Sequence, residues 1–102
     1  MNYEIIKIND KHYPQRLKQI KDPPDLIYGV GDISLLNTSS IAIIGSRDCT
    51  DYGVKICEVF SKELTNEGFT IVSGLARGID GIAQKTCIDA NGKTIAVLGR
   101  WI

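Results

Sequence analysis

An alternation of short apolar runs with helix-like segments, from residue 40 onward, most constrains how this chain can fold. Residues 41–44 read Ile-Ala-Ile-Ile without a polar side chain, and a glycine follows them. Such an unbroken run is typical of a strand that is covered on both faces, as in a parallel sheet. Similar runs at 69–72 and 94–98 predict two further strands of the same sheet.

The two segments between these runs have the periodicity of amphipathic helices. We predict helices over 53–67 and 79–90, the first stopped by Gly68 and the second by Gly92. The side chains expected to face inward are Ile56, Cys57, Phe60 and Leu64 in the first helix, and Ile82, Ala83, Thr86 and Cys87 in the second. The order β-α-β-α-β predicts an α/β fold with a parallel sheet.

The first part of the chain is less regular. We expect residues 1–39 to form a short N-terminal extension and residues 40–102 to form the α/β domain. The local elements expected in the extension are a short helix over 14–20, an extended Pro23-Pro24 segment, a strand over 26–28, and a turn through Leu36 capped by Asp32.

Charge and cysteine content restrict the function classes. The 12 Lys and Arg residues are balanced by 12 Asp and Glu residues, so any nucleic-acid binding must come from a local patch. The 3 cysteines show no C-x-x-C spacing, which predicts reduced thiols in the cytoplasm. Charged residues interrupt the N-terminal apolar run, and no apolar stretch approaches the roughly 20 residues of a membrane helix, so we expect no membrane partner.

Two glycine-bearing turns follow the first two predicted strands. Because right-handed crossovers bring the carboxyl ends of parallel strands to one edge, these turns should converge. Glycine amides, serine hydroxyls and arginine guanidinium groups can all bind anionic oxygens. The predicted anion site comprises Gly45, Ser46, Arg47, Ser73, Gly74, Arg77 and Gly78. Asp80 is expected to cap the second helix. The alternative is that the glycines only close tight turns and the arginines are solvated.

Familiar catalytic and cofactor motifs are missing from these turns. The first turn lacks G-x-G-x-x-G, and Ser73-Gly74 stands where a dinucleotide fold places an acidic residue, which argues against NAD. The sequence has no G-x-x-x-x-G-K-[ST] motif for ATP. The single histidine, His12, lies in the irregular extension, and no metal-ligand cluster is evident. We therefore predict a binding protein without a cofactor or catalytic residues.

Four blocks of the chain resemble the DprA or Smf family of bacterial DNA-processing proteins. They are Tyr13 to Gly31, Ile41 to Arg47 followed by Tyr52-Gly53, Ile71 to Asp80, and Gly92 to Gly99. The resemblance implies that the α/β fold is a Rossmann-like three-layer sandwich with a parallel sheet, which is incomplete in this chain, so that residues 40–102 form a partial Rossmann-like domain. It implies that this domain binds single-stranded DNA in natural transformation and loads RecA onto it. It also implies that the seven residues of the two turns line the pocket for the DNA backbone, and that the protein is not an enzyme.

The resemblance has three departures. Gln84 stands where the family usually has histidine, Trp101 replaces a glycine, and the family's domain extends beyond Ile102. We therefore expect a truncated fragment whose two arginines give a salt slope of only about −1.5, which is typical of weak binding. Two alternatives stay open. One is a Rossmann-like enzyme that binds nucleotide phosphates, and the other is an inactive remnant that forms a homo-oligomer through an unpaired sheet edge.

Overall fold

The computed structural model describes residues 3–45, 48–74 and 78–98, and the chain divides into two compact units, Met1–Thr38 and Ser39–Ile102. Each unit contains one sheet. The N-terminal unit has a two-stranded antiparallel sheet, and the C-terminal unit has a three-stranded parallel sheet with helices.

The N-terminal unit contains one strand that the sequence did not suggest. Strand β1 (Glu4–Lys7) pairs antiparallel with the expected strand β2 (Leu26–Gly29). The helix expected over 14–20 is reduced to the 3-10 turn η1 (Leu17–Gln19), and a second 3-10 turn, η2 (Ile33–Asn37), follows β2. A fully buried tyrosine, Tyr13, organises the segment between the strands by donating its hydroxyl to the Pro24 carbonyl oxygen at 2.7 Å.

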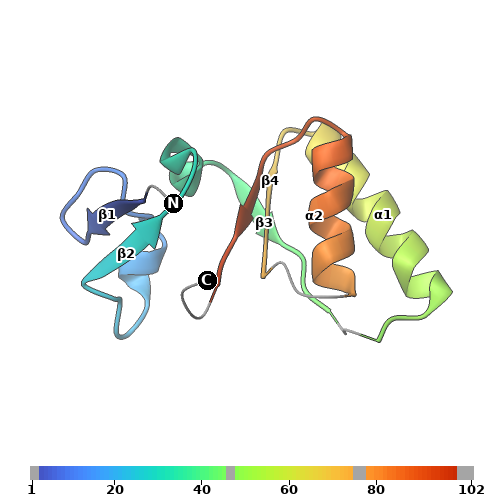
Figure 1. Ribbon diagram of the computed structural model, residues 1–102, viewed down its shortest axis with the longest axis horizontal. Coiled ribbons are helices and arrows are strands. Elements are labelled where there is room, and N and C mark those ends of the chain that lie inside the picture. The colour runs from blue at the N-terminus through green and yellow to red at the C-terminus, as the bar shows by residue number, and fades with distance from the viewer. Residues whose placement is uncertain (1–2, 46–47, 75–77, 99–102) are drawn as a thin grey trace. The chain divides into compact units, whose positions relative to one another are not determined.

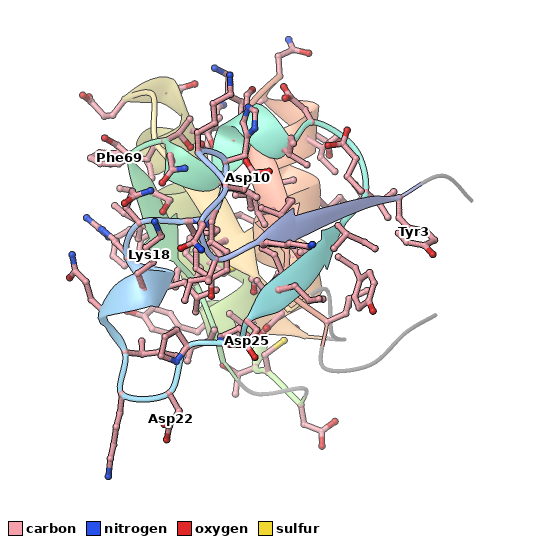
Figure 2. All side chains as sticks on the ribbon, turned by 90° about the vertical axis from the view of Figure 1, so that its left-hand side faces the viewer. Tyr3, Asp10, Lys18, Asp22, Asp25 and Phe69 are labelled. Carbon is pink, nitrogen blue, oxygen red and sulfur yellow. The ribbon has the colours of Figure 1, made fainter. Side chains whose placement is uncertain are left out.

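Asp32 caps η2 as predicted. Its Oδ1 accepts the Ser34 amide at 3.0 Å, which satisfies one of the free donors at the start of the turn. Charged groups of both signs lie on the surface of this unit, as Figure 2 shows for the exposed Lys18, Asp22 and Asp25. Residues 1–40 contain five basic and five acidic side chains, so this unit offers no excess of positive charge to a polyanion.

The C-terminal unit has the predicted β-α-β-α-β order. Its strands are β3 (Ser40–Ala42), β4 (Thr70–Ser73) and β5 (Thr94–Ala96), which are parallel and arranged in the order β3-β4-β5. Its helices are α1 (Asp51–Asn66) and α2 (Ile79–Asp89). The strands at the sheet edges are shorter than the apolar runs that predicted them, because ladder pairing ends before those runs do.

Both helices lie side by side on one face of this sheet (Figure 1). Two successive crossovers of the same hand and direction bring their helices to the same face. The described residues of this unit therefore form two layers of the expected three-layer sandwich. Directly after β3, Ile43 packs against the core, whereas the next side chain, Ile44, is 76% exposed.

The core between the sheet and the helices consists of Cys57, Ile71, Ala83 and Cys87. The prediction of which side chains face inward is largely confirmed for α2. For α1 it is partly wrong, because Phe60 is 58% exposed. The buried residues of α1 are instead Cys57, Ser61 and Thr65, whose small side chains allow α1 and α2 to pack closely. Burial raises the pKa of the Cys57 thiol, and all three cysteines are free.

The two helices end differently. Gly68 follows α1 with a φ of +94°, the left-handed conformation that the sequence predicted. After α2, however, the left-handed residue is Asn91, with a φ of +59°, so Gly92 does not terminate that helix. No helix in the described ranges has the length and apolar character needed to cross a membrane.

Candidate nucleic-acid interface

The two glycine-bearing turns leave the sheet from neighbouring strands. Gly45 lies beyond the end of β3, and Gly74 directly follows β4. The two carboxylate oxygens of Asp80 bridge them: Oδ1 accepts the Gly45 amide at 3.1 Å, and Oδ2 accepts the Gly74 amide at 3.2 Å. The predicted convergence of the two turns is therefore confirmed.

Four of the seven predicted site residues can be placed in this structure. Gly45, Ser73, Gly74 and Gly78 are described, whereas Ser46, Arg47 and Arg77 lie outside the described residues. The four placed residues surround the start of α2, where the amides of the first helical turn and the helix dipole favour negative charge.

Ser73 is the last residue of β4 and is only 4% exposed. Its hydroxyl donates to the Ile43 carbonyl oxygen at 2.5 Å, which ties β4 to the end of β3. A hydroxyl has one proton, so this group can serve either that carbonyl or the nearby Asp80 carboxylate. The Ser73 hydroxyl thus has its hydrogen-bond partners within the protein.

Gly45 is a glycine because the turn presses against α2. A Cβ at this position would lie 2.7 Å from the Cβ of Ile79, closer than real side chains approach. Gly74 has more room, since the nearest atom to its Cβ would be Asp80 Oδ2 at 3.3 Å. The amides of both glycines already have the Asp80 carboxylate as acceptor.

Gly78 starts helix α2. Its φ of +78° and ψ of −137° belong to a region that only glycine adopts without strain. Its carbonyl oxygen accepts the Ile82 amide at 3.0 Å, which is the first hydrogen bond of the helix. No side-chain cap is present at this position, so the glycine backbone sets the direction in which α2 begins.

The expectation that Asp80 caps α2 was wrong. The N-cap position is Gly78, and Asp80 lies in the first turn with its side chain directed back to the two loops. Burial of Asp80, which is 9% exposed, acts to raise its pKa, but the Ser73 hydroxyl beside the carboxylate and the hydrogen bonds from the Gly74 and Gly45 amides outweigh this effect. The net result is a pKa below the usual value, so Asp80 is a buried carboxylate that stays charged.

Gln84, one of the three departures from the family pattern, has a structural role. Its Nε2 donates to Thr94 Oγ1 at 3.0 Å and to the Ile95 carbonyl oxygen at 2.9 Å. The Thr94 hydroxyl in turn donates to the Ile71 carbonyl oxygen at 2.7 Å. The amide of Gln84 therefore joins α2 to the edge strand β5.

The bridging role of Asp80 was the main feature that the sequence analysis missed. The signal that could have revealed it is position in the helix: side chains in a first turn lean toward the helix N-terminus. An aspartate two residues after the helix-starting Gly78 is thus placed to reach back to the preceding loop.

Nearly the whole chain matches one protein family. The sequence pattern of the family "DNA recombination-mediator protein A" matches residues 4–102. The chain is 44% identical over 94 residues to the DNA processing protein DprA of Bacillus subtilis (strain 168), covering 91% of this chain and 32% of that protein. It is 39% identical over 98 residues to protein Smf of Escherichia coli (strain K12), covering 96% of this chain and 26% of that protein.

Solved structures give the same result. The X-ray structure of DprA from Streptococcus pneumoniae has a TM-score of 0.88 at 40% identity, covering 97% of this chain and 35% of that one. DprA from Helicobacter pylori, whose structure concerns its single-stranded DNA binding mode, has a TM-score of 0.81 at 37% identity, covering 94% and 42%. The chain thus spans about a third of the length of these relatives, and it belongs to the DNA recombination-mediator protein A family, which includes DprA and Smf.

Proposed function

We propose that the two glycine turns of this chain form part of a surface that binds single-stranded DNA. The observation that carries the proposal is the convergence of the turns, whose Gly45 and Gly74 amides meet on one carboxylate. The H. pylori relative supports it, because that protein binds single-stranded DNA. We also propose a role in natural transformation with RecA as partner, in keeping with a recombination mediator.

The seven residues of the turns would have different roles in binding. Gly45, Ser73 and Gly74 hold the turns in place through internal hydrogen bonds and close packing. We propose that Arg47 and Arg77 contact the phosphates of the strand with their guanidinium groups, in a way that does not depend on base sequence. Ser46 and Gly78 complete the lining.

A base-stacking contribution would come from Tyr52. This side chain lies in the first turn of α1, shortly after the Gly45 turn, and is 76% exposed. Stacking of a nucleic-acid base on an exposed aromatic ring contributes about 1–3 kcal/mol per base. Tyr52 is therefore proposed as a contact that adds affinity without adding to the salt dependence.

Binding fits this site better than catalysis. Asp80 is the buried carboxylate at the turns, and both of its oxygens accept glycine amides. A pKa below the usual value makes Asp80 a poor general base, because a strongly stabilised carboxylate has little affinity for a proton. This favours a DNA-binding surface over the alternative of a nucleotide-phosphate enzyme.

Fluorescence anisotropy with a labelled oligo-dT at low salt tests the proposal. We expect weak binding with the small salt slope of about −1.5 that two neutralised phosphates give. The double variant Arg47→Ala/Arg77→Ala should abolish most of this slope. A matched control, Arg16→Ala/Lys21→Ala, removes the same charge from exposed positions of the N-terminal unit and should bind like the wild type.

Two results would overturn the proposal. One is the absence of salt-dependent binding by the folded chain. The other is equal weakening by both double variants, which would mean that only total charge matters and that the turns are not the site.

A further inference from the structure

We propose that Asp80 is the positioning residue that sets the separation of the two DNA-contacting turns, by accepting the amide of one glycine from each. This inference rests on the proposed function for its consequence in DNA binding, but the bridge itself can be tested without DNA. Asp80 does not touch the strand in this proposal. It acts through the backbone of Gly45 and Gly74.

The bridge begins where sheet pairing ends. The last pair of the β3-β4 ladder is Ala42 with Val72, and the Ile43 amide then donates to the Val72 carbonyl oxygen at 3.0 Å. Beyond this point the segments that follow β3 and β4 have no backbone hydrogen bond to each other among the described residues. The carboxylate of Asp80 replaces the missing ladder, because each of its oxygens accepts a hydrogen bond from one of these two segments.

The bridge is anchored in helix α2, which fixes its position. Asp80 lies in the first turn, next to Ile79, whose side chain packs against the Gly45 turn. The Ile79 carbonyl oxygen accepts the Cys57 thiol of α1 at a sulfur-to-oxygen distance of 3.5 Å. The packed helices α1 and α2 therefore fix the position from which Asp80 sets the separation of the turns.

This arrangement changes how a phosphate would be bound. The Gly45 and Gly74 amides are directed to a carboxylate within the protein, so phosphate contacts must come from other groups of the turns. A carboxylate is also a like charge near a polyanion. If Asp80 acted on DNA only through its charge, removing that charge would strengthen binding. If Asp80 acts by positioning, removing it weakens binding.

The variant Asp80→Asn separates these two effects by sign. An asparagine keeps the shape but offers one acceptor oxygen and one amide donor, so one glycine amide would face another donor. We expect oligo-dT affinity to fall about tenfold, which corresponds to about 1.4 kcal/mol. The matched control is Asp89→Asn, which removes the same charge from an exposed position on the same helix and should not weaken binding. Unchanged or tighter binding by a folded Asp80→Asn variant would overturn the proposal.

A second measurement tests the bridge without DNA and without a variant. In ¹H–¹⁵N spectra of the wild-type chain, we expect the Gly45 and Gly74 amide resonances to move together, with one shared midpoint, as acid protonates Asp80. The Cys57 thiol, which also senses the charge of Asp80, has a raised pKa and titrates in the alkaline range, so it does not interfere. Separate midpoints, or no movement of one amide, would overturn the bridge. Joint movement in a chain that does not bind DNA would instead contradict the proposed function alone.

Discussion

The two ends of the α/β unit both depend on glycine, but for different reasons. At the end where β3 and β4 finish, Gly45 and Gly74 donate their amides to a buried carboxylate. At the opposite end, where α2 turns into β5, Gly92 makes room for side chains. A Cβ at Gly92 would overlap the Thr65 methyl group and lie 2.7 Å from Cys87 Sγ.

The difference shows that glycine spacing alone does not identify a binding edge. The Gly92 end is occupied by the protein itself, since Thr65 and Cys87 are both buried there. The Gly45 end combines glycines with a charged carboxylate that bridges the two turns. It also has arginines two residues after Gly45 and three after Gly74. Polar groups that organise a turn, rather than the glycines themselves, distinguish the candidate site.

The largest effect is expected at the Gly92 end. Gly92→Ala should lower the free energy of unfolding by about 3 kcal/mol, near the upper end for overpacking, because the added methyl group overlaps Thr65 in a closely packed contact. Urea denaturation monitored by circular dichroism measures this. DNA binding by the remaining folded protein should be unchanged.

Gly68→Ala is the control for that variant. Gly68 has a φ of +94° but no atom within 4 Å of an added Cβ, so its replacement adds backbone strain without overlap. We expect a loss of about 1 kcal/mol. Equal losses at Gly68 and Gly92 would show that the packing at the Gly92 end is looser than described.

The next effect is expected to differ between the two glycines of the site. Gly45→Ala should lower the free energy of unfolding by about 2 kcal/mol, because the Cβ of Ile79 is branched and cannot move away from an added methyl group. Gly74→Ala should lower it by less than about 1 kcal/mol, since its nearest contact at 3.3 Å needs only a small shift. Urea titrations of both variants test the order, and a larger loss at Gly74 would contradict it.

Much of the fold could be predicted because its signals are local. The apolar runs around Ile43, Ile71 and Ile95 indicated the three parallel strands, and chirality then required the turns after β3 and β4 to converge. The turn capped by Asp32 was also predictable, because an aspartate side chain bonds to the backbone two residues on.

The features that could not be predicted depend on contacts distant in sequence. Phe60 fits the helical stripe by periodicity, yet small residues such as Thr65 occupy the buried face because α1 packs against α2. Asp80 has the ordinary appearance of a helix cap, and its role appears only when Gly45, 35 residues earlier, is seen at its Oδ1. Strand β1 buries only Ile6 among its four residues, so it lacks the alternation typical of a strand and is defined by its pairing with β2.

The pH dependence of the Asp80 contribution distinguishes a buried carboxylate from an exposed one. Because the native pKa of Asp80 lies below its unfolded value of about 4, its stabilisation is complete above that pH and is lost as the pH falls through the native pKa. Asp80→Asn should therefore be less stable than the wild type by about 1 kcal/mol at neutral pH, and this difference should shrink in acid.

Asp89→Asn provides the comparison within the same helix. Asp89 pairs with Lys85 at 3.1 Å on the exposed side of α2, and such i,i+4 pairs contribute about 0.3–0.5 kcal/mol. Salt screens exposed pairs more strongly than buried ones, so the Asp89 difference should vanish in urea titrations at high salt while the Asp80 difference persists. If both differences disappeared with salt, Asp80 would be acting as a surface charge, and the distinction between the two ends of the unit would lose its electrostatic basis.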